Sequence, residues 1–322
     1  MGDQLGFAEA FLADKAGQNH RLARIDGLID WSALEALLPP APCGPGRPSY
    51  PALAMFKALL LAQWYRLSDP ALEEAVADRI SFRRFCGFAL DAVTPDETTF
   101  CRFRSELARK GHGEQLMAEL DRQLGCRGFL VKEGTMIDAT LIAAQASRPS
   151  GPAPSQVQPG EESTAVDPDA AFAKQGDKTV YGYKAHVAVD LGSGLIRRAM
   201  LTPANVHDTG PADHLVMGDE RAVYADKAYA THARRQALKA RRIKDRIMHR
   251  PNKHHPQLPY WQARRNALIR PIRAAIERTF GTWKRGYGYT CVRYFSLAAN
   301  AIELQLKCIA FNLRRAAVLA AA

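Results

Sequence analysis

The sequence predicts an α+β or α/β fold in which an all-helical N-terminal region precedes a region with a mixed sheet. Three observations predict it. Helical periodicity and capping signals extend to about Arg127; short apolar, β-branched runs then alternate with helical segments; and a Pro-, Gly- and Ser-rich stretch interrupts the second region. With 322 residues the chain can form more than one domain. We expect domains at 1–127 and 128–322.

The N-terminal region is predicted to contain several short helices. Ser49 can cap the first, Asp69-Pro70 starts another, and Thr94-Pro-Asp-Glu97 forms a capping box that opens a helix ending near Gly111. The expected exposed side of that last helix carries Arg102, Arg104 and Arg109. Such basic faces suit a helix-turn-helix-like reader of DNA. A plain helical bundle remains the alternative.

Residues 144–177 form an insertion directly after the first predicted strand. They combine Pro and Gly with Ser, Gln and Glu and contain very few apolar residues. Such a composition cannot bury enough surface to order itself in isolation. We expect a flexible insertion, either a simple disordered linker or a loop that orders on DNA.

The second region then alternates strands and helices. Residues 181–190 and 195–202 are predicted strands, and Leu-Gly-Ser-Gly between them indicates a hairpin. Asp208 or Thr209 is expected to cap a helix entered through Pro211. The remaining elements are a strand at 223–226, a helix at 231–241, a strand at 243–248, the helix that contains Glu277, and an apolar helix at 297–318.

Two aspartates belong to predicted strands of this region. Asp138 lies within the apolar run 134–142, where an ionised carboxylate is costly unless it is paired or bound to metal. Asp226 ends the strand at 222–226, and ligands of open α/β sheets bind at such carboxyl ends. Either residue alone is also compatible with a strand-end cap or a turn.

A third carboxylate lies on the predicted helix 271–286, which Pro271 can begin and Gly286 can end. Arg273, Glu277, Gly281 and Lys284 recur at helical spacing on one face, and Ile272, Ile276, Phe280 and Trp283 form an apolar second face. One Glu among cations could bind a divalent metal beside a phosphate backbone. A solvated face with an intrahelical Arg–Glu pair is the alternative.

Charge favours a polyanionic partner. The formal net charge is +11 at pH 7, and residues 234–293 contain seventeen Lys or Arg against only Asp245 and Glu277. The interleaved aromatics can stack on unpaired bases: Tyr260, Trp261, Trp283, Tyr287 and Tyr289. A merely soluble basic surface, or one that binds acidic proteins or anionic membranes, is the alternative.

Taken together, these blocks resemble the DDE transposases of bacterial insertion sequences, in particular the insertion-sequence-five family. Its C-terminal signature is Tyr, two residues, Arg, three residues, Glu, six residues, Lys. Arg273, Glu277 and Lys284 match it, and Arg270 occupies the Tyr position, a departure that concerns DNA positioning more than chemistry. Residues 181–186, 202–208 and 224–229 also look like blocks of this family. The resemblance covers nearly the whole chain.

The resemblance implies an RNase H-like catalytic domain in which Asp138, Asp226 and Glu277 hold two Mg²⁺ ions, with Mn²⁺ able to substitute. It implies metal-dependent cleavage at the element's ends and transfer of the 3′ hydroxyl into target DNA. The N-terminal domain would serve DNA-end binding or dimerisation. Expected DNA-binding residues are Arg273, Lys284, Arg270, Lys227, Lys184, Arg278 and Arg285, with His207 as possible support.

The partners implied are DNA, both terminal inverted repeats and target, and a second copy of the chain, because two ends are handled together. A non-joining nuclease of the same fold and a DNA-binding protein derived from an inactive transposase remain alternatives. The six scattered Cys lack the close spacing of zinc or redox motifs. We expect reduced thiols, no membrane segment, and a bacterial cytoplasmic protein that is nucleoid-associated when bound. His249, His254 and His255 are interpreted as residues of a solvent loop.

Overall fold

The computed structural model describes residues 19–40, 49–145, 166–176, 178–251 and 256–321. It divides into two compact units. The helical unit comprises Met1–Arg127 with Gln305–Ala322, and the sheet unit comprises Gly128–Leu304. The boundary after Arg127 is where the sequence placed it, but residues 305–322 belong to the helical unit, not to a domain spanning 128–322.

The long C-terminal helix α13 (Leu297–Leu319) explains that difference. Its first residues belong to the sheet unit and the rest to the helical unit. Within the helical unit, the indole nitrogen of Trp64 donates to the carbonyl of Ala310 at 2.8 Å, and Lys307 Nζ donates to Gln63 Oε1 at 2.7 Å. Both contacts are buried, so these polar groups are satisfied inside the unit.

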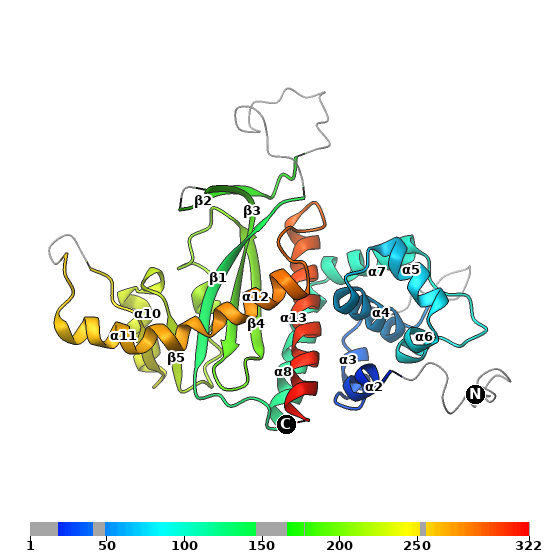
Figure 1. Ribbon diagram of the computed structural model, residues 1–322, viewed down its shortest axis with the longest axis horizontal. Coiled ribbons are helices and arrows are strands. Elements are labelled where there is room, and N and C mark those ends of the chain that lie inside the picture. The colour runs from blue at the N-terminus through cyan, green and yellow to red at the C-terminus, as the bar shows by residue number, and fades with distance from the viewer. Residues whose placement is uncertain (1–18, 41–48, 146–165, 177, 252–255, 322) are drawn as a thin grey trace. The chain divides into compact units, whose positions relative to one another are not determined.

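The helical unit is built around α4 (Ala52–Tyr65), which is buried along nearly its whole length. Phe56, Leu60 and Leu61 of α4 are fully buried. The other helices of this unit are α2 (His20–Asp26), α3 (Trp31–Glu35), α5 (Asp69–Asp78), α6 (Ile80–Cys86), α7 (Glu97–Arg109) and α8 (His112–Cys126), all drawn in Figure 1. A helix that is apolar on every side is typical of a buried central helix.

Of the predicted helix starts in this unit, α5 begins at Asp69 as expected, whereas the caps of α4 and α7 differ from those predicted. Pro51 is the N-cap residue of α4 and no side chain caps it, so Ser49 does not. Asp96, not Thr94, caps α7, accepting from the Thr99 amide at 2.7 Å. The Thr94 carbonyl instead accepts a hydrogen bond from Tyr50. Asp96 is among the residue types that cap helices best, and it lies directly before the first residue of α7.

One of the three arginines predicted to be exposed on α7 is buried. Arg104 donates to both carboxylate oxygens of Asp69 in α5, at 2.8 and 2.5 Å. The fork of a guanidinium matches a carboxylate in this geometry, and a buried guanidinium needs such a partner. Arg102 and Arg109 are exposed as predicted.

The sheet unit contains a six-stranded mixed sheet. Its strands are β1 (Thr135–Ala143), β2 (Ala171–Gln175), β3 (Lys178–Asp190), β4 (Ile196–Pro203), β5 (Ala222–Ala225) and β6 (Lys244–Ile247). The order is β2-β3-β1-β5-β6, and β4 also pairs with β3. The β1–β3 and β3–β4 pairs are antiparallel, whereas β1–β5 and β5–β6 are parallel. The predicted hairpin and the RNase H-like element order are confirmed.

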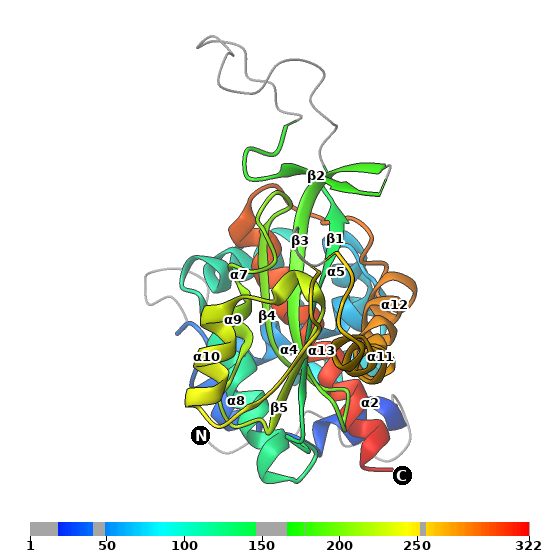
Figure 2. The same cartoon turned by 90° about the vertical axis from the view of Figure 1, so that its left-hand side faces the viewer.

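Helices lie on both sides of this sheet. Figure 2 shows α9 (Ala212–Leu215) and α10 (His232–Ala240) on one side, and α11 (Tyr260–Ala274) and α12 (Ile276–Gly286) on the other. Ile137, Val223 and Leu238 belong to the buried core cluster that includes α9 and α10. No described helix is long and apolar enough to cross a membrane.

Part of the predicted flexible insertion is a strand. Residues 171–175 form β2 and pair with 182–178 of β3. Asp167, just before β2, is buried and accepts a hydrogen bond from the Tyr183 hydroxyl at 2.6 Å. That anchor orders a segment whose composition alone does not predict order. Residues 146–165 lie outside the described residues, as do Cys43, His254 and His255.

The helix that contains Glu277 begins later than predicted. Pro271 lies inside α11, and α12 starts at Ile276 after a junction at Ala275. Proline removes one amide donor to the residue four positions earlier. That residue, Ala267, is exposed, so water can satisfy its carbonyl and the helix continues. The predicted apolar face is confirmed, with Ile276, Phe280 and Trp283 buried.

Candidate active site

Two aspartates lie side by side on the central parallel strand pair. In the β1–β5 ladder Met136 is opposite Tyr224 and Ile137 is opposite Ala225. Asp138 follows Ile137 within β1, and Asp226 follows Ala225. Asp226 is the first residue after β5 and caps the short 3₁₀ helix η2 (Lys227–Tyr229), accepting from the Lys227 amide at 2.6 Å. The strand register therefore brings two predicted carboxylates together at a strand end.

Asp138 is largely buried and holds two hydrogen bonds. One carboxylate oxygen, Oδ1, accepts from the Ala139 amide at 2.9 Å, and Oδ2 accepts from Arg273 Nη1 at 2.6 Å. Burial raises the pKa of Asp138 to about 6, against the opposing effect of Arg273 and with a further rise from Asp226 and Asp208. Keeping this buried carboxylate ionised is costly without a cationic partner, which Arg273 supplies.

Glu277 occupies the first turn of α12 and is exposed. The buried apolar face of α12 turns this carboxylate outward, as the sequence predicts. Its Oε1 lies 3.5 Å from Arg273 Nη2. Arg273, near the end of α11, therefore bridges Asp138 and Glu277 with one nitrogen on each, and the Arg–Glu pair considered from the sequence is present alongside the site.

The donor set fits a divalent cation by type. All three side chains offer carboxylate oxygens, the ligands that Mg²⁺ prefers, and Asp138 and Asp226 each follow a residue of the last β1–β5 pair, Ile137 and Ala225. Among the described residues, however, no three His, Cys, Asp or Glu side chains converge closely enough to hold an ion. Arg273 occupies the position between Asp138 and Glu277 instead.

Lys184 and His207, two weaker candidates, have local partners. Lys184 Nζ contacts the Val206 carbonyl at 2.9 Å and Asp208 Oδ1 at 2.8 Å. His207 Nδ1 contacts Thr209 Oγ1 at 2.9 Å within its own turn. These contacts stabilise the loop between β4 and α9. Asp208 pairs with Lys184. The N-cap residue of α9 is Pro211 and no side chain caps this helix, so neither Asp208 nor Thr209 has the predicted capping role.

The other predicted DNA-binding cations are exposed. They are Lys227, which follows Asp226, Arg270 on α11, and Arg278, Lys284 and Arg285 on α12. Lys284 lies two turns after Glu277 on the same helical face. Figure 1 shows α11 and α12 running one after the other across the sheet, and they contact β5 and β1, respectively. Arg270, Arg278, Lys284 and Arg285 therefore belong to helices on the same side of the sheet as Glu277.

Tyr229 is a residue of this neighbourhood that no sequence pattern marked as functional. It is 1% exposed, and its hydroxyl has no hydrogen-bond partner in the described part of the chain. Burial raises the pKa of Tyr229, and the negative charges of Asp138 and Asp208 raise it further. The only signal was an aromatic residue three positions after Asp226. Tyr229 therefore places a buried hydroxyl in the electrostatic neighbourhood of Asp138 and Asp208.

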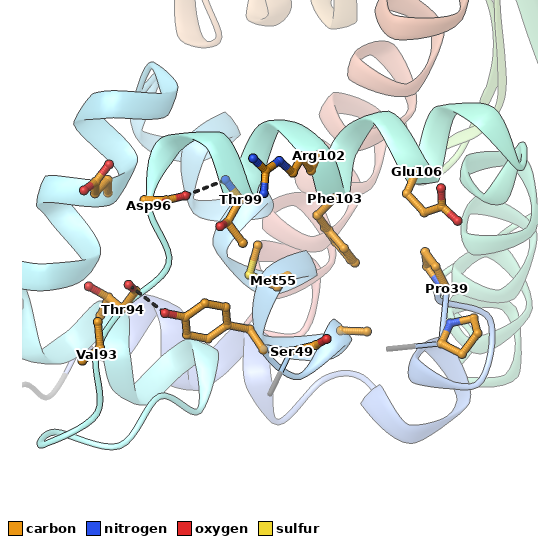
Figure 3. Close-up of a pocket in the computed structure, with 14 residues that line it drawn as sticks. Pro39, Ser49, Met55, Val93, Thr94, Asp96, Thr99, Arg102, Phe103 and Glu106 are labelled. Atoms are coloured by element: carbon orange, nitrogen blue, oxygen red, sulfur yellow. Dashed lines mark hydrogen bonds between the residues drawn. The ribbon is translucent and has the colours of Figure 1, made fainter. Parts of the chain in front are cut away.

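A cavity of about 750 Å³ lies in the helical unit and contains none of the predicted site residues. Figure 3 shows the apolar side chains of Met55 and Phe103 and the charged side chains of Arg102, Asp96 and Glu106 among the residues that line it. Asp96 is already bonded to Thr99 as a helix cap. The cavity is thus separate from the carboxylates of the sheet unit.

Comparison with known proteins supports the resemblance seen in the sequence. A family model described as "Transposase domain (DUF772)" matches residues 10–106. A solved structure of the piggyBac transposase synaptic complex with hairpin DNA is similar at 10% identity and a TM-score of 0.44, over 94% of this chain and 74% of that one, which is too distant to argue from. A model described as "Transposase DDE domain" matches residues 130–313, more than half of the chain. The chain therefore belongs to the DDE transposase family, as a transposase enzyme of the insertion-sequence type.

Proposed function

We propose that this transposase cleaves DNA at the ends of its insertion sequence and joins the freed 3′ hydroxyl to target DNA, with Asp138, Asp226 and Glu277 as the catalytic carboxylates. One observation carries the assignment. Asp138 and Asp226 each follow a residue of the last parallel β1–β5 pair, and Arg273 contacts both Asp138 and Glu277. Three acids from three separate elements are thus connected within one unit.

The metal dependence of DDE transposases gives these acids their role. We assign two Mg²⁺ ions, with Mn²⁺ as a substitute, to Asp138, Asp226 and Glu277 because all three present hard oxygen donors. Bound divalent ions supply charge stabilisation at the phosphodiester and a more acidic attacking water or hydroxyl. Asp138 and Asp226 have the strongest support from the fold, because the residue before each, Ile137 and Ala225, is paired with the other in the β1–β5 ladder.

The exposed cations would bind the DNA backbone around these acids. Lys227, Arg270, Arg278, Lys284 and Arg285 all reach solvent. Lysine offers a phosphate a point charge, and arginine offers a planar fork. Arg273 and Lys184 belong to the same proposed surface but also have carboxylate partners. Neutralising phosphates in this way positions DNA without reading its sequence.

Sequence recognition and pairing of ends would come from elsewhere in the chain. The helical unit, matched by the transposase model over residues 10–106, is our candidate for binding the terminal inverted repeats or for dimerisation. Arg102 and Arg109 are the exposed cations on its helix α7. A homodimer on DNA follows from the need to process two ends together. His207 supports the site only indirectly, through its turn.

Cleavage of labelled DNA that carries the element's ends tests the carboxylate assignment. With Mg²⁺ we expect nicks at the ends, lost in Asp138→Ala, Asp226→Ala and Glu277→Ala while DNA binding by mobility shift persists. Glu133→Ala is the matched control, because Glu133 is an exposed carboxylate of the same unit, 4.0 Å from Arg221. Retained cleavage in Asp138→Ala would overturn the assignment.

The same reactions distinguish joining from simple hydrolysis. A transposase converts a pre-cleaved end and a target duplex into a joined product, whereas a nuclease of the same fold does not. The joining step needs no covalent enzyme intermediate, because the DNA's own 3′ hydroxyl attacks the target phosphodiester in line. Joined products in the wild-type protein, absent in Glu277→Ala, are the expected result.

A further inference from the structure

Arg273 is held between two proposed catalytic carboxylates in an unequal arrangement. Its Nη1 lies 2.6 Å from Asp138 Oδ2, and both side chains are mostly buried, at 18% and 19% exposed. Its Nη2 lies 3.5 Å from Glu277 Oε1, and that carboxylate is 65% exposed. The guanidinium therefore makes one short buried ion pair and one long exposed pair.

This arrangement places Arg273 in competition with a divalent ion. Asp138 Oδ1 already accepts from the Ala139 amide, and Oδ2 accepts from Arg273. A cation bound at Oδ2 would lie close to a guanidinium of like charge, where burial leaves little water to screen the repulsion. Cation binding at Asp138 and the Arg273–Asp138 pair therefore oppose each other.

A DNA phosphate is the partner that can draw Arg273 away. Each terminal nitrogen of the guanidinium contacts a different carboxylate, so neither carboxylate makes a bidentate pair with Arg273. A phosphate can accept two parallel hydrogen bonds from one guanidinium. Arg270, Arg278 and Lys284 are exposed near it on α11 and α12 and would hold a phosphate backbone close by. Among these arginines and lysines of the two helices, Arg273 is the one bonded to Asp138.

We propose that Arg273 couples divalent-ion binding to DNA binding: it pairs with Asp138 until a phosphate of the DNA takes it over, and Asp138 then becomes available to the ion. The inference rests on the proposed function of the same site and adds how DNA regulates divalent-ion binding there. By linkage, DNA must tighten ion binding by the same factor as the ion tightens DNA binding. The enzyme thus gains full metal affinity only with its substrate in place.

Mn²⁺ binding followed by electron paramagnetic resonance tests the coupling without any turnover. The DNA is a pre-cleaved end duplex whose terminal nucleotide lacks the 3′ hydroxyl, so no joining occurs. In the wild-type protein this duplex should tighten Mn²⁺ binding by about fivefold or more. In Arg273→Gln, Mn²⁺ should bind about fivefold or more tighter without DNA, and adding DNA should change that affinity less than about twofold.

Lys284→Gln is the matched control, because Lys284 is an exposed cation of the same surface that lies on α12. It should weaken DNA binding while leaving Mn²⁺ affinity without DNA at the wild-type value. Arg273→Lys guards against misfolding of the Gln variant, since it keeps the charge and loses the fork. Its Mn²⁺ affinity without DNA should fall between the wild-type and Arg273→Gln values.

Two results would overturn the inference and are distinguishable from each other. If Asp138→Ala abolishes Mn²⁺ binding but Arg273→Gln binds no tighter than wild type, the coupling is absent and the proposed metal site stands. If Asp138→Ala leaves Mn²⁺ affinity unchanged, both the coupling and the proposed site are wrong. Thermal unfolding of each variant confirms that folded proteins are compared.

Discussion

The carboxylates on the sheet and the carboxylate on the helix are positioned by different forces. Backbone pairing between β1 and β5 places Asp138 and Asp226, whereas side-chain packing of α12 places Glu277. Asp138 is largely buried with a raised pKa, and Glu277 is exposed. Substituting Asp138 should therefore change the unfolding free energy of the sheet unit, whereas substituting Glu277 should change it little. Four predictions test this contrast, in order of decreasing effect.

The largest effect should appear in Asp138→Asn and Glu277→Gln, each of which should lower end cleavage by about a thousandfold or more, or about 4 kcal/mol of activation free energy. Their unfolding free energies should differ. Glu277→Gln should remain within about 0.5 kcal/mol of wild type, because the group is exposed, whereas Asp138→Asn leaves the mostly buried Arg273 without its closest partner. Urea unfolding and cleavage rates measure both. Equal stability changes would remove the contrast.

The next effect concerns the packing that aims Glu277. Trp283 lies on the buried face of α12 and is 1% exposed. Its ring packs edge-on against the rings of Phe280 and Tyr289. Trp283→Ala should cost about 3–5 kcal/mol of unfolding free energy through the lost contacts and the cavity. Thr282→Ala, at the exposed adjacent position, is the control and should change little. A Trp283→Ala protein of wild-type stability would contradict the packing account.

A pH effect of up to about 3 kcal/mol should come from His186 on β3. Burial lowers its pKa from 6.5 to about 4, and its Nε2 contacts Thr202 Oγ1. Because the unfolded chain takes up the proton at higher pH, this contribution is fully present above pH 6.5 and is lost as pH falls toward 4, at about 1.4 kcal/mol per pH unit. Asp138, with its pKa raised, changes stability in the opposite direction.

Denaturant unfolding between pH 7 and 4 can isolate that contribution by comparing wild type with His186→Gln. The Gln side chain keeps a polar group near Thr202 but does not titrate. We expect the wild-type protein to lose more stability than the variant as pH falls. Parallel pH profiles for the two proteins would show that His186 is not held neutral by burial.

The smallest effect should follow removal of one exposed cation. Lys284→Ala or Arg278→Ala should leave stability within about 0.5 kcal/mol of wild type. Each should weaken DNA binding to any sequence by a similar amount and reduce the slope of log affinity against log salt by about one. Lys244→Ala, an exposed lysine on β6, is the comparison variant. Unchanged salt slopes would place the DNA away from α12.

The residues of the candidate site lie on elements that local signals in the sequence predict. The spacing of Arg273, Glu277 and Lys284 is that of one helical face, and Asp138 and Asp226 each belong to a short apolar run that forms a strand. Their neighbourhood followed from the resemblance and from the order of elements. The Arg273–Asp138 ion pair was not predictable, since 135 residues separate its partners and no local pattern encodes that distance.

The fold shows the same division. Residues 190–196 predict their hairpin because a tight turn between apolar strands is a short-range property. Order at β2, burial of Arg104, and the switch of α13 into the helical unit each depend on a partner far along the chain: Tyr183 for Asp167, Asp69 for Arg104, and α4 for residues 305–322. Composition and periodicity do not reveal which distant residues form these contacts.

By itself, then, the sequence determined most of the strands and helices, β2 excepted, and which of them carry the three acids and the basic side chains, because these features depend on residue type and on spacing within one or two turns. The tertiary structure decided which polar groups meet. It paired Arg273 with Asp138, Lys184 with Asp208, and it left the Tyr229 hydroxyl buried without a partner among the described residues. The reason is physical: burial makes unpaired charge costly, so a folded chain selects partners by proximity in space, which only the assembled sheet and its helices define.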